Sequence, residues 1–430
     1  MYMQSVLRLL MFLLMAHSSL AHAQVPLPNQ TLSAAQPGVA AARLFGQSMA
    51  SNGQYLAIGA PFYSGASGGT SPGVVLIFQR SGNTWNFLNA VQAPTPANGD
   101  GFGANVIFSG AQLLVGAPYS TVNSVSQRGA VYTYNIVAGL YAYTETVNPG
   151  IAPSSADWYG FHLSADSGWL AIGIPFGSPN NAGQVQLFRY DGDLERWVYH
   201  SAVNGAQAGG RHGIRVLMRG DRLLVGATEE QATASTRGWA YEYQRTGTGP
   251  TASWAQVQRF RQTAGTVSVF GSAFALSPAG TTLLIGAPYE LAANSSAQTG
   301  AVFAFTRNLT GQWEQSARID PAVVGVAENF GTSIAFADET SAVIGDVREG
   351  SAQALGAAHL YRQVTGNTWN RSASWQRGSG AAGDFMGASL LAVGDQLLIG
   401  ASGIDNGASL DEGRVFVYNG ALGVFRNGFE

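Results

Sequence analysis

Phe102-Gly103 followed by Leu113-Leu114-Val115-Gly116-Ala117-Pro118 is the stretch that decides the fold, because the same phrase returns along the chain. An apolar run that ends in glycine occurs at seven positions, namely Gly59, Gly116, Gly173, Gly226, Gly286, Gly345 and Gly400. An aromatic-glycine or related pair precedes each run, and its glycine lies 13 to 15 positions before the run-ending glycine. The pairs are Phe45-Gly46, Phe102-Gly103, Tyr159-Gly160, His212-Gly213, Phe270-Gly271, Phe330-Gly331 and Met386-Gly387. A period of 53 to 60 residues between the run-ending glycines predicts a repeat architecture.

Each repeat carries the signals of four strands. The apolar runs are short and continuous, which indicates strands buried on both faces. Segments such as Gly129-Ala130-Val131, with an aromatic at Tyr134, are β-prone and partly alternating. A further aromatic opens a fourth segment in six repeats, at Trp85, Tyr141, Trp197, Trp254, Trp313 and Trp369. A single four-stranded meander cannot bury both of its faces, so seven of them packed radially predict an all-β, seven-bladed propeller of antiparallel blades.

The seventh repeat has no clear fourth segment after Tyr418. Gln30-Thr31-Leu32, near the start of the chain, resembles the fourth segment of the other repeats. We therefore expect the N-terminal strand to complete the last blade and to leave no open sheet edge.

The motifs resemble those of FG-GAP repeats, the units of the integrin α-subunit propeller. Complete Gly-Ala-Pro follows the apolar run at Gly59, Gly116 and Gly286, and related tripeptides occupy the other four positions. The resemblance implies one propeller domain over residues 24–418. Integrin-type repeats often carry a calcium loop between their first two strands, but here the turns at 51–53 and 109–110 are too short and lack carboxylates.

The two ends of the chain lie outside the predicted propeller, and their sequences concern export of the protein. Residues 1–23 have the pattern of a secretory signal peptide, with Arg8, an apolar segment over 9–15 and a cleavage site at Ala21-His22-Ala23. Residues 419–430 form a short tail, interpreted as either a sorting tag or an unstructured end. No later stretch reaches about 18 apolar residues, so we expect a secreted or periplasmic protein with no transmembrane segment. With a net charge of -3, the chain lacks the excess of basic residues typical of nucleic-acid-binding proteins, so no nucleic-acid partner is expected.

No motif names a catalytic, cofactor-binding or metal site. Two acidic clusters, Asp191-Gly192-Asp193 with Glu195 and Asp405, Asn406, Asp411 with Glu412, are interpreted as solvated turns, with residual calcium binding as the open alternative. Gly-x-Ser-x-Gly occurs around Ser67 and Ser71, but in a glycine-rich loop that leads into a strand instead of a helix. His212 replaces the usual phenylalanine and, like the repeated tryptophans, is interpreted as packing. The sequence predicts no cofactor.

The functional prediction is based on the lengths of the loops between the predicted strands. The second connections, such as 119–128 and 402–412, are long, and antiparallel strands would gather them on one face. The leading hypothesis is therefore a non-enzymatic binding or adhesion module, a monomer that presents this face to a protein or carbohydrate partner. The alternatives are a propeller enzyme acting on an extracellular glycan, with Asp346 and Asp384 as the acids to examine, and a structural envelope protein.

Overall fold

The computed structural model describes residues 26–39, 42–62, 72–177, 179–233, 236–263, 267–293, 296–322, 329–348, 355–377, 380–381, 383–405 and 411–422. The predicted signal peptide, most of the tail, Ser67, Ser71 and Asn406 lie outside these ranges. Within them, the chain forms 29 strands and one short 3-10 helix, η1 (Gly249–Thr251). No helix in the described part is long and apolar enough to cross a membrane.

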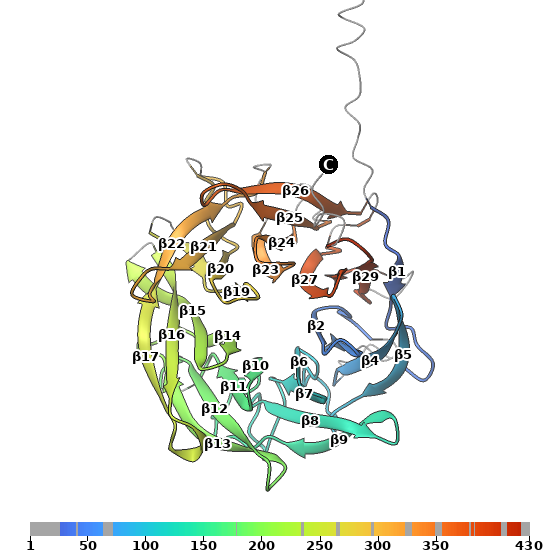
Figure 1. Cartoon of the computed structure of the whole chain (residues 1–430). Coiled ribbons are helices and arrows are strands. Elements are labelled where there is room, and N and C mark those ends of the chain that lie inside the picture. Colours follow the sequence, from blue (N-terminus) through green and yellow to red (C-terminus); the bar gives the residue numbers. More distant parts are fainter. Residues whose placement is uncertain are drawn as a thin grey trace, which may run out of the picture.

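The strands form seven antiparallel blades arranged in a ring, as predicted (Figure 1). Blades 1 to 3 are β2 (Ser48–Ser51), β3 (Tyr55–Ala60), β4 (Val74–Ser81), β5 (Thr84–Val91); β6 (Asn105–Ser109), β7 (Gln112–Ala117), β8 (Ala130–Val137), β9 (Leu140–Thr146); and β10 (His162–Asp166), β11 (Trp169–Ile174), β12 (Gln184–Asp191), β13 (Arg196–Asn204). Blade 4 is β14 (His212–Arg219), β15 (Arg222–Thr233), β16 (Thr236–Thr246) and β17 (Ser253–Phe260), with β18 (Val267–Phe270) pairing in parallel with β16.

Blades 5 and 6 are β19 (Ala273–Leu276), β20 (Thr282–Ala287), β21 (Ala301–Arg307), β22 (Trp313–Ile319); and β23 (Phe330–Phe336), β24 (Ser341–Asp346), β25 (Ala357–Gln363), β26 (Trp369–Gln376). Blade 7 is β27 (Met386–Val393), β28 (Gln396–Ala401) and β29 (Arg414–Tyr418), and its fourth strand is β1 (Gln30–Leu32). In β1, Gln30 pairs with Val417 and Leu32 with Val415. The prediction that the N-terminal strand closes the last blade is confirmed.

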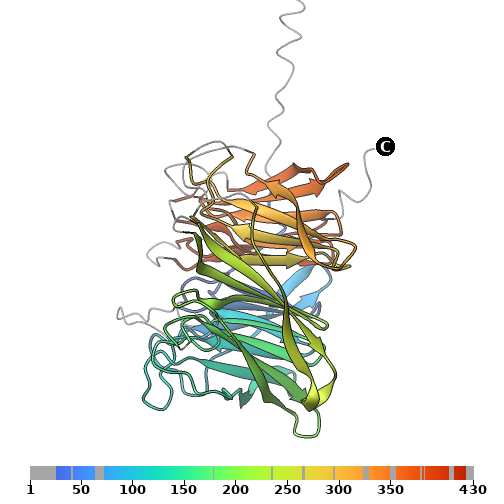
Figure 2. The same cartoon turned by 90° about the vertical axis from the view of Figure 1, so that its left-hand side faces the viewer.

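The apolar runs form the second strand of each blade. Every residue of β3, β11, β20, β24 and β28 is buried, because neighbouring blades cover both faces of these strands. The repeated tryptophans are mainly packing residues, as predicted; Trp85, Trp197, Trp313 and Trp369 are at least nine-tenths buried. The strands run between the two faces of the ring (Figure 2). First and third connections therefore lie on one face, and second connections and the links between blades lie on the other.

The two repeated glycines meet where one blade packs on the next. A Cβ atom on Gly116 would collide with the carbonyl oxygen of Gly160, the glycine of the following blade's aromatic-glycine pair. Gly160 itself has a φ of 87°, a conformation that disfavours other residues. The same contact joins Gly59 to Gly103, Gly173 to Gly213, Gly226 to Gly271, Gly286 to Gly331, Gly345 to Gly387 and Gly400 to Gly46. The repeat signature therefore marks the closest approach of adjacent blades.

Candidate functional site

The two acids proposed from the sequence lie in structural positions. Asp384 precedes β27, and its carboxylate accepts the Ala381 backbone N–H at 3.2 Å and pairs with Arg377. Asp100 and Asp157 make the same kind of contact three residues before the corresponding glycines of blades 2 and 3. Asp346 is buried at the end of β24, opposite Phe330 and Ala357 in the sheet. Asp384 is thus one of three aspartates that shape the links between blades.

The acidic clusters also serve their turns. Asp191 accepts the backbone N–H groups of Asp193 and Leu194, each at 3.2 Å, and its other oxygen pairs with Arg189. In the seventh blade, Asp411 pairs with Arg43 and Glu412 pairs with Arg414 at 3.0 Å. Over the described residues, no three His, Cys, Asp or Glu side chains group in a way that could hold a metal ion.

A ring of polar side chains, which the sequence reading missed, joins the innermost strands. The second residue after the aromatic-glycine pair is polar in six blades: Ser48, Asn105, His162, Arg215, Ser333 and Ser389. Ser48 Oγ donates to the Gly103 carbonyl at 2.7 Å, and Arg215 Nε donates to the Ser272 carbonyl at 2.5 Å. His162 Nδ1 accepts the Val216 N–H at 3.4 Å, and burial, aided by the nearby Arg215 charge, holds the pKa of this imidazole well below its ordinary value. Each side chain contacts the next blade, so the ring is structural.

His212 is fully buried against the rings of Tyr241 and Tyr243, which supports its interpretation as packing.

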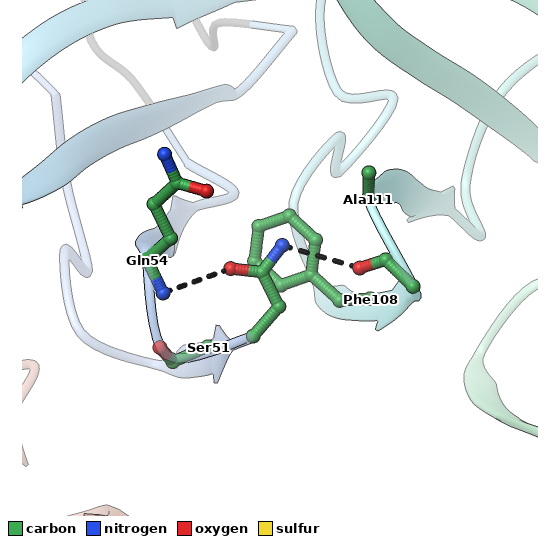
Figure 3. A pocket seen from close by; sticks show the side chains of 6 residues that line it. Ser51, Gln54, Phe108 and Ala111 are labelled. Carbon is green, nitrogen blue, oxygen red and sulfur yellow. Dashed lines mark hydrogen bonds between the residues drawn. The ribbon is translucent and has the colours of Figure 1, made fainter.

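A shallow hollow of about 390 Å³ lies between the first turns of blades 1 and 2 (Figure 3). Asn52 lines this hollow, but its amide group is used within the turns, because it accepts the Gln54 and Tyr55 N–H groups and donates to the Gly110 carbonyl. The hollow carries no charged group.

The outer strands of blades 2 and 3 enclose a larger space, of about 590 Å³, which we call the outer cleft. Its lining residues come mainly from β8 and β9 and from the hairpin between β12 and β13. Blades 2 and 3, which contain these strands, are neighbours in the ring (Figure 1). The side chains that line it are mostly polar and include Asn135, Tyr143, Glu145, Asn148, Tyr190, Glu195 and Arg196. Tyr143 and Tyr190 are exposed and offer flat rings with hydroxyl groups.

Two glutamates with different surroundings meet in the outer cleft. Glu145 is half-buried on β9, and burial raises its pKa even though the Trp197 N–H and the Arg196 charge act in the opposite direction. Its Oε2 atom is buried and has no hydrogen-bond partner among the described residues. Glu195 is exposed at the hairpin turn, where its φ of 51° bends the chain. Burial first, and then the charges of Glu195 and Glu145, raise the pKa of the Tyr190 hydroxyl.

This arrangement suits acid–base chemistry. A carboxyl group with a raised pKa keeps its proton to higher pH than usual and can serve as an acid, and an exposed carboxylate in the same cleft can serve as a base. Sequence reasoning placed Glu195 in a solvated turn and did not single out Glu145. The predicted architecture could have indicated Glu145, because it places the fourth strand of one blade beside the outer hairpin of the next blade, here the hairpin that carries Glu195.

A scan of the sequence against protein-family models and against curated proteins gave no match. Solved structures with the same fold include the periplasmic gluconolactonase of Pseudomonas aeruginosa, 16% identical with a TM-score of 0.52, which covers 77% of this chain and 85% of its own. A putative 6-phosphogluconolactonase from Bacteroides fragilis is 10% identical with a TM-score of 0.52, covering 77% of this chain and 84% of its own.

These neighbours correct the functional prediction. Both are named as enzymes, so the expectation of a non-enzymatic adhesion module, which rested partly on analogy with integrins, is wrong. The expectation that the chain is not an enzyme is wrong for the same reason. The outer cleft also lies at the side of the ring and not among the long loops. The comparisons show that the chain has the β-propeller fold of these lactonases.

Proposed function

We propose that the protein is a hydrolase of carbohydrate-derived substrates and that the outer cleft is its active site. The observation that carries this proposal is Glu145, a half-buried residue with a raised pKa that lines a polar cleft together with Glu195 and two tyrosines. The fold neighbours named as gluconolactonase and 6-phosphogluconolactonase support sugar lactones as the first substrate class to test.

The proposed reaction uses water, the two carboxyl groups and Arg196. Glu195 accepts a proton from water as the water oxygen bonds to the lactone carbonyl carbon. The bond between that carbon and the ring oxygen then breaks, and Glu145 donates its proton to the departing oxygen. The products are the opened hydroxy acid and, after proton exchange with solvent, the original protonation states. Arg196 lies in the same cleft and stabilises the negative charge that develops on the carbonyl oxygen.

Two further parts of the interpretation belong to this proposal. We infer that the protein is exported by the leader at residues 1–23 and acts outside the cytoplasm as a monomer. We also infer that its repeats are divergent relatives of the FG-GAP type, on the strength of the seven paired glycine motifs.

The test is a hydrolysis assay of the purified mature protein on sugar δ-lactones, with aryl glycosides as a parallel panel. Glu145→Gln keeps the shape of the side chain but cannot act as an acid, so we expect kcat to fall by about 10²-fold or more with little change in KM. The activity that remains should no longer decline as pH rises through the raised pKa of Glu145. Asp193→Asn, which alters an exposed acid in the same hairpin, is the matched control. Full activity of Glu145→Gln and Glu195→Gln on every substrate would refute the assignment.

A further inference from the structure

Blade 4 differs from its neighbours on the face that carries the second connections. Strands β15 and β16 are 12 and 11 residues long, whereas β3 and β4 of blade 1 have 6 and 8. The extra residues continue the sheet as a projecting hairpin in which Thr233 pairs with Thr236. Register shifts near Gln231 bend this extension. Paired strands therefore stand where other blades have loops.

Arginines gather around this hairpin. Arg237 lies on β16, Arg259 at the end of β17, Arg261 just after it, and Arg211 on the link that leads into the blade. The side chains of Arg211, Arg237 and Arg259 are 41%, 42% and 37% exposed, so their guanidinium groups reach solvent. We call these four residues the blade 4 arginine cluster.

Two consecutive glutamates form ion pairs with three members of the arginine cluster. Glu229 pairs with Arg237 at 2.9 Å and with Arg211 at 3.8 Å. Glu230 is 2% exposed, pairs with Arg259 at 2.5 Å and accepts the Tyr241 hydroxyl at 2.7 Å. Four arginines against two glutamates leave an excess of two positive charges. A chain with a net charge of -3 has concentrated positive charge here.

Aromatic contacts fix the guanidinium planes. Arg259 lies 3.6 Å from the centre of the Trp239 ring and Arg261 lies 5.3 Å from it, while Arg211 lies 5.0 Å from the Phe176 ring. Such cation–π contacts reduce the entropy that a flexible arginine would lose on binding a ligand.

A pocket of about 270 Å³ lies beside the cluster, lined by Gln207, Arg211, Glu229, Gln231 and Arg237 among others. Gln207 accepts the Gln231 backbone N–H at 2.5 Å, which orients its amide group. Planar guanidinium groups recognise carboxylates through paired hydrogen bonds, and amide groups bind hydroxyls. The pocket thus combines partners for a carboxylate with partners for a hydroxylated body.

We propose that this pocket is a second saccharide subsite that binds the carboxylate of an acidic sugar. It lies on the face opposite the first turns and on a different blade from the outer cleft. The inference rests on the arginine cluster and its pocket and not on the proposed reaction. The test below therefore measures binding and not turnover.

The experiment is a calorimetric titration of the purified protein at low salt with an oligomer of galacturonic acid. A neutral glucose oligomer of equal length and inorganic phosphate are the comparison ligands. We expect the acidic oligomer to bind, and the double variant Arg211→Gln with Arg237→Gln to bind it about tenfold more weakly or worse. Arg80→Gln with Arg371→Gln removes two arginines from other blades and should leave binding unchanged.

The variant Glu229→Gln should change the affinity for the acidic oligomer in the opposite direction. Removing this negative charge should strengthen binding severalfold, and this result does not depend on how the double variant folds. The proposal is overturned if the double variant binds as tightly as the wild type, or if Glu229→Gln weakens binding. It is also overturned if the neutral oligomer binds equally well, or if phosphate displaces the acidic oligomer at equal concentration. A protein that binds but hydrolyses none of the panel would refute the proposed reaction alone.

Discussion

Gly116→Ala tests whether the repeated glycines are the points of closest approach between blades. The new methyl group would overlap the Gly160 carbonyl oxygen, which is backbone of the neighbouring blade and cannot rotate away. Both strands are held by buried side chains such as Leu114, Leu163 and Leu170, so one blade must shift against the other. Overpacking of this kind typically costs about 1–3 kcal/mol, and the upper half of that range applies because the obstacle is backbone. The loss of chain entropy on replacing glycine offsets about 0.4–1 kcal/mol.

We therefore expect Gly116→Ala to lower the free energy of unfolding by about 2 kcal/mol, measured by urea denaturation with tryptophan fluorescence. Gly192→Ala is the matched control, because a Cβ atom there meets nothing within 4 Å. It should change stability by no more than about 0.5 kcal/mol. Equal stabilities for Gly116→Ala and the wild type, at an unchanged urea dependence, would refute the proposed role of the glycine contacts.

His212 and Gln30 give two further stability predictions. Burial lowers the pKa of His212 from 6.5 to about 3, so the folded state keeps it neutral while the unfolded state protonates it, and stability is lost as pH falls below 6.5. His212→Phe should remove about 2 kcal/mol of this loss between pH 7.5 and 5.0, measured by urea denaturation at both values; an unchanged pH dependence would contradict it. Gln30→Ala removes two hydrogen bonds, to the Trp85 carbonyl at 2.7 Å and from its N–H at 2.9 Å. It should destabilise the ring by about 1–3 kcal/mol in thermal or urea unfolding, whereas the exposed Thr31→Ala should not.

The fold was predictable because its determinants repeat. Each blade needs the same two glycines and the same buried run, so the pattern recurs seven times and outweighs any local ambiguity. The closing strand was predictable for a related reason. Gln30-Thr31-Leu32 matches the one segment that the seventh repeat lacks, and a propeller cannot leave that edge unpaired.

The candidate site could not be found in the same way, because it does not repeat. Glu145 is an ordinary residue of a fourth strand, and only its position beside the hairpin of blade 3 buries it and raises its pKa. Asp384 attracted attention as an acid near the centre of the ring, yet it holds a turn as Asp100 does. Of the two acids chosen from the sequence, Asp346 and Asp384, the second makes a contact that recurs with the repeat and therefore serves the fold.

The same reasoning directs attention to blade 4. A ring of equivalent blades is stabilised by what the blades share, so charged residues at otherwise apolar positions are a cost that the fold does not require. Blade 4 has Glu242 where the other blades have Ile77, Thr133, Leu187, Ala304, Leu360 and Val417, and this buried carboxylate pairs with Arg307 of blade 5 at 2.6 Å. It also has His212 where the other blades have phenylalanine, tyrosine or methionine, Arg215 in the inner ring and an extended hairpin that carries part of the arginine cluster. These departures from the repeat lie in one blade, which is why the proposed site for an acidic sugar is placed there.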